Sequence, residues 1–76
     1  MEQPPEPPEV PPSELTAAQR RIAPMLAQGW SITVIAVTLD LPAETVELCR
    51  DSIYKKLGTE DRAALAQWVI RHQVID

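Results

Sequence analysis

Apolar residues recur at spacings of three and four along the chain from about residue 15 onward, and no stretch alternates with period two for long. Spacings of three and four place apolar side chains on one face of an α-helix, whereas alternation is typical of a half-buried strand. The pattern therefore predicts an all-α domain of four helices.

The first predicted helix has residues at both ends that commonly bound helices. Thr16 is placed as its N-cap, and the helix runs to about Gln28 with Gly29 as its stop. Pro24 lies inside it and predicts a kink or a late start, because proline removes one helical hydrogen bond and crowds the preceding turn. The side chains expected to be buried are Ile22, Met25 and Leu26.

The next two predicted helices are separated by a short connection, Asp40 to Ala43. Ser31 is a plausible N-cap for the earlier one, while Pro42 fits the first turn of the later one and Gly58 terminates it after Leu57. The earlier helix is expected to bury Ile35, Ala36 and Leu39. The later one is expected to bury Val46, Ile53 and Leu57, together with Cys49 or Arg50. Two helices joined by so short a turn predict a helix-turn-helix.

The fourth helix is predicted to begin near Thr59 to Asp61, where acids suit the positive end of the helix dipole. Its apolar stripe is expected to consist of Leu65, Ala66, Val69 and Ile70. Trp68 falls on the flank of that stripe.

The opening stretch has a different composition, since six of the eight prolines lie within residues 1–14. The stretch contains four acidic residues, Glu2, Glu6, Glu9 and Glu14, and no Lys or Arg, so it carries the whole net charge of −4. Proline and like charges favour an extended chain, so residues 1–14 are predicted to be a disordered tail or linker and residues 15–76 the folded domain. A solvated spacer is favoured over a ligand for a proline-recognising partner.

Catalytic and metal-binding constellations are not found in the sequence. Cys49 and His72 are the only residues of their kinds and lie far apart, and no CxxC pair, glycine-rich phosphate loop or HExxH spacing occurs. The sequence therefore predicts a protein that is no enzyme and needs no cofactor, metal or small-molecule substrate. No apolar run is long enough to cross a bilayer, so a cytoplasmic protein without a membrane partner is expected.

The segments LTAAQRRIAPMLAQGWS, IA..L.L, ETV...R..I.KKLG and DRAAL together resemble the LuxR (GerE, or NarL/FixJ-like) carboxy-terminal DNA-binding domain. The resemblance covers Leu15 to about Ile75. It implies a four-helix fold whose third helix enters the major groove of duplex DNA and whose fourth helix forms a homodimer.

Carried over position by position, the resemblance also implies a set of site residues. The base-facing residues would be Glu47, Leu48 and Asp51. The phosphate contacts would come from Arg20, Arg21, Thr45, Arg50, Lys55 and Lys56. The dimer or partner interface would contain Ala64, Trp68 and Arg71, although packing of Trp68 by one edge against the first helix is an equal alternative.

The departures from the family pattern gather on the third helix. Glu47 stands where the family commonly has a lysine, Asp51 lies at the next exposed turn, and Cys49 replaces the usual histidine. A groove-facing carboxylate is repelled by phosphates, and residues 15–76 hold seven acids against seven bases, so weak or specialised DNA binding is expected.

Apolar residues beside the third helix keep a second hypothesis open. Ile32, Val34 and Leu48 are candidates for exposure, whereas Trp30 is expected to fill a core pocket. The first hypothesis is a transcription regulator that binds duplex DNA as a dimer. The alternative is a helix-turn-helix module that does not bind DNA but binds protein, as an antagonist or adaptor of another transcription regulator.

Overall fold

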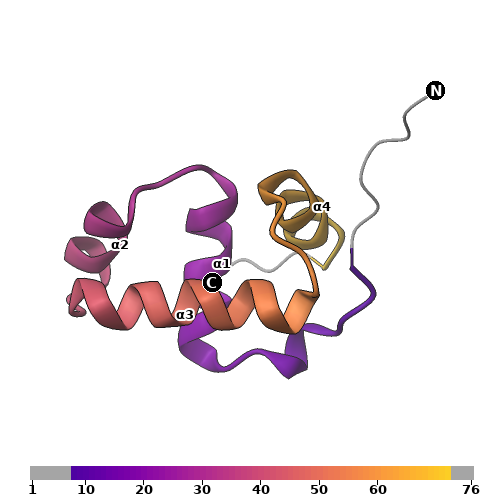
Figure 1. The fold of residues 1–76 in the computed structure, drawn as a ribbon, viewed down its shortest axis with the longest axis horizontal. Helices are drawn as coiled ribbons and strands as arrows, with labels where there is room; N and C mark the ends of the chain where they lie inside the picture. The colour runs from indigo at the N-terminus through magenta and orange to yellow at the C-terminus, as the bar shows by residue number, and fades with distance from the viewer. Residues whose placement is uncertain (1–7, 73–76) are drawn as a thin grey trace.

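The computed structural model describes residues 8–72, and every regular element in that range is helical (Figure 1). A single 3-10 turn, η1 (Pro12–Glu14), precedes four α-helices. These are α1 (Ala17–Ala27), α2 (Ile32–Leu39), α3 (Ala43–Leu57) and α4 (Arg62–His72). The predicted all-α fold of four helices is confirmed. No helix within the described range is long and apolar enough to cross a membrane.

The helix α1 begins where the sequence predicts, because Thr16 and Gln19 form a reciprocal capping box. The Gln19 amide donates to the Thr16 hydroxyl, and the Thr16 amide donates to Gln19 Oε1, both over 3.1 Å. The helix then continues through Pro24 to Ala27, so the late start considered for it is wrong. Gly29 has φ +87°, a left-handed conformation that favours glycine, and a Cβ there would also require the flexible end of the Arg62 side chain to move.

The helix-turn-helix is bounded by the predicted residues. The Ser31 hydroxyl accepts from the Val34 amide at 3.2 Å and caps α2, and Asp40 ends it in a left-handed conformation with φ 56°. Pro42 occupies the N-cap position of α3, and Gly58 closes that helix with φ 71°. Within this fold α3 packs against both α1 and α2, while α4 packs against α1 (Figure 1).

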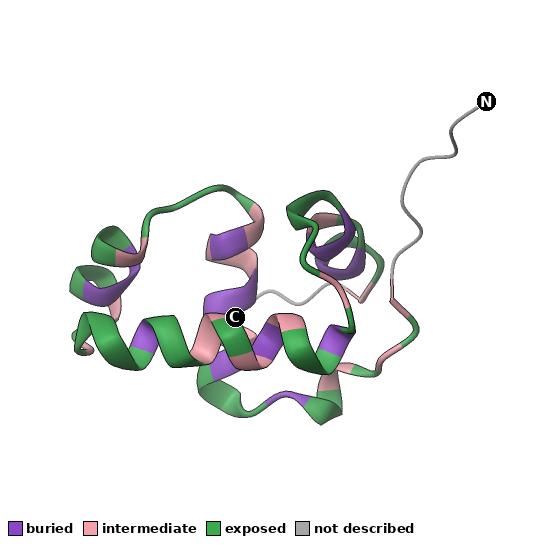
Figure 2. Ribbon diagram, in the orientation of Figure 1, coloured by how far each residue is buried: buried purple, intermediate pink, exposed green. Residues whose placement is uncertain are grey.

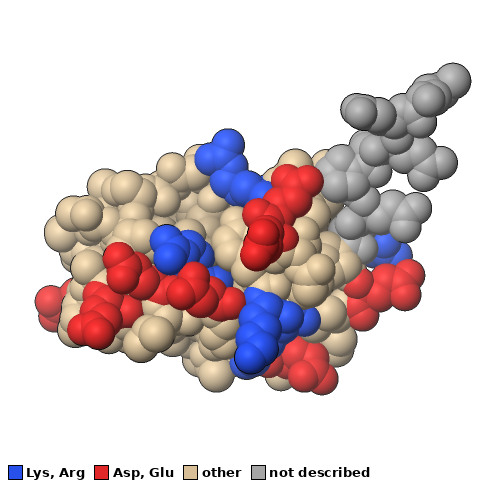
Figure 3. All heavy atoms as spheres, in the orientation of Figure 1, with Lys and Arg blue, Asp and Glu red and all other residues tan. Residues whose placement is uncertain are grey.

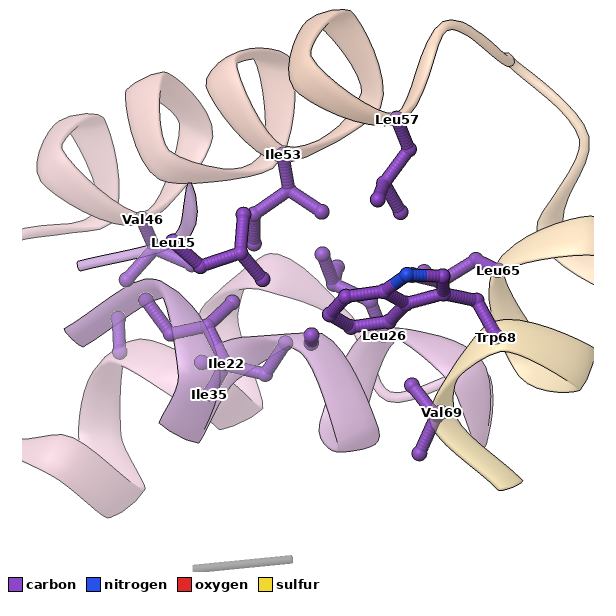
Figure 4. Packing of buried hydrophobic residues seen from close by; sticks show 12 residues of the cluster. Leu15, Ile22, Leu26, Ile35, Val46, Ile53, Leu57, Leu65, Trp68 and Val69 are labelled. Carbon is purple, nitrogen blue, oxygen red and sulfur yellow. The ribbon is translucent and has the colours of Figure 1, made fainter. Parts of the chain in front are cut away.

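The core lies where α1, α3 and α4 meet, with Ile35 and Ala36 contributed by α2 (Figure 2 and Figure 4). The buried residues predicted for α1, α2 and α3 are buried or half-buried as expected. In α4 the prediction is partly wrong, since Ile70 is 69 % exposed and Trp68 is fully buried. Trp68 has the largest apolar area in this helix, and its indole N–H donates to Val10 O at 2.7 Å, so burying it leaves no polar group unpaired.

The segment just before α1 packs on the domain. Val10 lies against the core, Leu15 is 2 % exposed, and the carbonyl of Glu14 accepts from Lys56 Nζ at 3.0 Å. The disordered tail predicted for residues 1–14 therefore needs correction from Val10 onward, because the indole of Trp68 and the ammonium of Lys56 supply hydrogen bonds to that backbone. Residues 1–7 of the predicted tail lie outside the described residues.

Candidate functional site

The outer face of α3 is the most distinctive surface of the helix-turn-helix. Val46, Ile53 and Leu57 are buried on the inner side of this helix, so the residues on its opposite side point away from the core. Glu47, Leu48 and Asp51, which were predicted to face DNA bases, are all exposed. The side chain of Leu48 is 65 % exposed and contributes apolar surface between the two acids.

The charges on this face are mixed. Figure 3 shows acidic side chains over the first half of α3, with basic side chains beside them and further along the helix. Arg50 Nε lies 3.1 Å from Asp51 Oδ1, and the two side chains are 38 % and 67 % exposed. An ion pair so open to water adds little stability, but it gives the Arg50 guanidinium an acidic neighbour at the position where a phosphate contact was predicted.

Lys56 connects α3 to the beginning of α1. Its ammonium donates to Glu14 O at 3.0 Å and to Gln19 Oε1 at 2.9 Å, and Gln19 Nε2 in turn donates to Ser52 Oγ at 2.9 Å. Gln19 is only 7 % exposed, so this network satisfies a buried amide as well as holding the two helices together. Lys56 is an exposed residue, and the structure gives its ammonium a framework contact that was not predicted from the sequence.

The other predicted phosphate residues lie in two places. Arg20 is half-buried and its Nη1 donates to Leu15 O at 2.9 Å, which makes it part of the framework of α1. Arg21 lies on the exposed side of the same helix. Thr45 and Lys55 are exposed near opposite ends of α3.

The exposed side of α2 carries two valines and two threonines and no charged residue. Val37 and Val34 are 77 % and 50 % exposed, and they lie opposite the buried Ile35 and Ala36. The sequence predicted exposure of Val34 but not of Val37, although the helical phase set by Ile35 and Ala36 places Val37 outward as well. Trp30 is 38 % exposed and does not fill the core pocket that was expected for it.

An open hollow of about 640 Å³ lies where α3 passes into α4. It is lined by Asp51, Tyr54, Lys55, Gly58, Thr59 and Glu60. Burial raises the pKa of Tyr54 above its ordinary value of 10.0, Arg62 and Arg50 oppose this shift, and Asp61 adds to it. Among residues 8–72, no group of three or more His, Cys, Asp or Glu side chains is arranged to hold a metal ion.

The interface residues carried over onto α4 need correction. Ala64 is 4 % exposed and Trp68 is fully buried, so neither side chain is available to a second molecule in this conformation, while Arg71 is exposed. The Trp68 ring instead lies beside His72, with ring centroids 5.3 Å apart. The side of α4 that faces outward carries Gln67 and Ile70.

Comparison with known proteins accounts for most of the chain. Residues 13–69 match the family described as "Bacterial regulatory proteins, luxR family". The chain is 36% identical over 62 residues to the "Probable transcriptional regulatory protein NarL" of Mycobacterium tuberculosis, which covers 82% of this chain and 29% of that protein. It is 38% identical over 53 residues to the "Transcriptional regulatory protein UhpA" of Escherichia coli K12, covering 70% and 27%. The chain thus spans less than a third of each relative, and no solved structure matches it significantly.

Proposed function

The chain belongs to the luxR family of bacterial regulatory proteins and forms that family's helix-turn-helix DNA-binding domain. We propose that it binds duplex DNA with the outer face of α3 in the major groove. The family is one of transcription regulators, not of enzymes. The observation that carries the proposal is the intact helix-turn-helix, in which α1 and α2 hold the inner face of α3 and leave Glu47, Leu48 and Asp51 exposed. The major groove is wide enough to admit an α-helix, and the outer face of α3 is exposed to enter it.

The phosphate contacts in this proposal come from both ends of α3 and from α1. Thr45, Lys55 and Lys56 are exposed residues, so all three can approach a DNA backbone beside the groove. Arg21 is exposed on α1 and joins them, and Arg20 and Arg50 complete the set, with contacts to Leu15 O and Asp51 in the folded domain.

The dimer in this proposal uses the outward side of α4. Ile70 is a large apolar residue with 69 % of its side chain exposed, and Gln67 and Arg71 are exposed beside it. Ala64 and Trp68 no longer belong to the proposed interface. A two-fold dimer would place two copies of α3 on successive turns of one DNA face. Action on bacterial DNA would place the protein in the cytoplasm.

A second function is favoured by the surface of α2. Val34 and Val37 are exposed, and no Lys or Arg lies in Ile32–Leu39, so this helix offers a phosphate backbone nothing positive. Leu48 and Trp30 are exposed as well, and exposed apolar side chains suit contact with protein. In this alternative the domain acts as an antagonist or adaptor of another transcription regulator.

An NMR titration of the isotopically labelled protein separates the two functions. A generic duplex is added at low salt and near physiological salt, while the amides of residues 44–57 are followed. Shifts centred on Thr45, Lys55 and Lys56 that weaken as salt rises are expected, because counterion release gives DNA binding its salt dependence.

The same sample tests the dimer and the alternative. Dilution without DNA should move the amides of Gln67, Ile70 and Arg71 if these residues meet across a dimer. A spectrum that does not change with duplex at low salt would contradict DNA binding and favour the protein-binding function.

A further inference from the structure

The two acids on the outer face of α3 are not equivalent. Asp51 is paired with Arg50 Nε at 3.1 Å, so part of its capacity to accept hydrogen bonds is already used. Glu47 is exposed and makes no hydrogen bond or ion pair with any residue of the range 8–72. The Glu47 carboxylate can therefore accept hydrogen bonds from a ligand without losing a bond within the domain.

The chemistry of a carboxylate limits which base edge it can bind. In the major groove, guanine presents two acceptors and thymine presents an acceptor and a methyl group, so neither offers a proton to a carboxylate. Cytosine presents its N4 amino group without an acceptor beside it, whereas adenine pairs its N6 amino group with the N7 acceptor, which repels a second carboxylate oxygen. Glu47 should therefore favour cytosine over the other three bases.

Leu48 supports the same kind of site. Leu48 is 65 % exposed and lies, like Glu47, on the part of α3 that is proposed to enter the groove. An apolar side chain at a base edge gains most from the C5 methyl group of thymine. The two neighbouring residues thus match pyrimidine edges, one through a hydrogen bond and one through an apolar contact.

We propose that Glu47 is a specificity-determining residue that selects cytosine at one position of the DNA site, with Leu48 favouring thymine nearby. This inference rests on the proposed function, because it requires α3 to enter the major groove. It converts the unfavourable charge of Glu47 into selectivity: repulsion by phosphates weakens binding to all DNA, and only a site with cytosine at the contacted position compensates for it.

The test is selection of binding sites from a randomised duplex library with the wild-type protein, with Glu47→Gln and with Glu44→Gln. The wild type should enrich cytosine at one position of each half-site, and replacing that cytosine should weaken binding about fivefold or more. Glu47→Gln should change the preferred base at that position to adenine, because a glutamine amide pairs with both N6 and N7 of adenine.

Glu44→Gln is the matched control, because Glu44 is also exposed on α3 and the substitution removes the same charge. It should strengthen binding to all sequences without changing the preferred base. In the same selected site, replacing thymine by uracil should weaken binding of the wild type and leave Leu48→Ala unaffected.

The outcomes separate the inference from the proposed function. Enrichment of a site whose base preference is the same for the wild type and Glu47→Gln would overturn the role of Glu47 while leaving DNA binding intact. A change at the same position with Glu44→Gln would also overturn it, since the preference would then follow charge alone. If no sequence is enriched by the wild type or by either variant, and no duplex binds at low salt, the proposed function fails as well.

Discussion

The inner and outer faces of α3 follow different rules. On the inner face, Val46, Ile53 and Leu57 are buried in the core. On the outer face, the exposed Glu47 and Asp51 occupy a surface where a DNA-binding helix would ordinarily gain from positive charge. One helix therefore carries both residues that hold the core together and residues that are open to a binding partner.

The difference shows that fold and binding specificity can change independently on a single helix. Buried positions are constrained by packing, because a changed volume costs stability whatever the protein binds. Exposed positions can exchange a lysine for a glutamate with little effect on folding, and the consequence appears only when a partner approaches.

The largest expected effect comes from shortening a side chain on the inner face. Ile53→Ala should lower the free energy of unfolding by about 2–5 kcal/mol, because Ile53 is fully buried and its removal leaves a cavity. Leu48→Ala on the outer face should change it by about 0.5 kcal/mol or less. Urea denaturation followed by circular dichroism measures both variants.

A domain of this size could unfold entirely with Ile53→Ala, so Ile53→Val provides a milder test. It should cost about 0.5–1.5 kcal/mol. Equal losses for Ile53→Val and Leu48→Ala would contradict the distinction between the two faces.

The next largest effect is expected from substitutions that reverse a charge on the outer face. Glu47→Lys and Asp51→Lys should each strengthen binding to generic duplex DNA several-fold at low salt, because each removes a repulsive carboxylate and adds an ammonium. If the new lysine contacts one phosphate, the slope of log affinity against log salt should steepen by about 0.9. Fluorescence anisotropy across a salt series measures this slope. Unchanged affinity for both variants would place α3 outside the groove.

Lys56 lies at the edge between the two faces and should show a smaller effect of each kind. Lys56→Met keeps the aliphatic stem but removes hydrogen bonds to Glu14 O and Gln19 Oε1, so unfolding should become easier by about 1 kcal/mol. The salt slope for DNA should also fall by about 0.9 if the ammonium contacts a phosphate. A stability loss with an unchanged slope would assign Lys56 to the framework alone.

The smallest effect concerns Tyr54 at high pH. Burial raises the pKa of Tyr54 in the folded protein above the ordinary tyrosine pKa of 10.0. As the pH rises past 10.0, the unfolded chain therefore loses the phenolic proton before the folded protein does. The stability that the buried, protonated Tyr54 contributes is fully present below pH 10.0 and should decline as the pH rises through the pKa of the folded protein. Chemical denaturation at a series of alkaline pH values should show a weaker decline for Tyr54→Phe. An identical pH dependence in both proteins would be evidence against the burial effect.

Local signals in the sequence were enough to predict the limits of the helices. Thr16 and Ser31 accept the capping hydrogen bonds assigned to them, and Gly58 adopts the left-handed conformation that ends α3. Caps and turns depend on neighbours within a few residues, so the sequence contains the information directly. The exposure of Glu47, Leu48 and Asp51 was predictable in the same way, because it follows from the phase of one long helix.

Contacts between distant segments could not be predicted in this way. Ile70 was expected inside and Trp68 on the flank, but the structure has the opposite arrangement. The side of α4 that turns inward depends on Val10, 58 residues away in sequence, whose carbonyl accepts the indole proton. For the same reason, Lys56 was assigned only to DNA, although its ammonium also bonds to Glu14 O and Gln19 Oε1.

The sequence by itself determined the four helices, their caps, the family and the acidic outer face of α3, because periodicity, capping and charge are properties of short stretches of chain. Only the tertiary structure decided the orientation of α4, the packing of Val10 on Trp68 and the exposure of Val37 and Ile70. These features depend on which large side chain can bury its surface and still pair its polar atom, and that is settled only when distant segments meet.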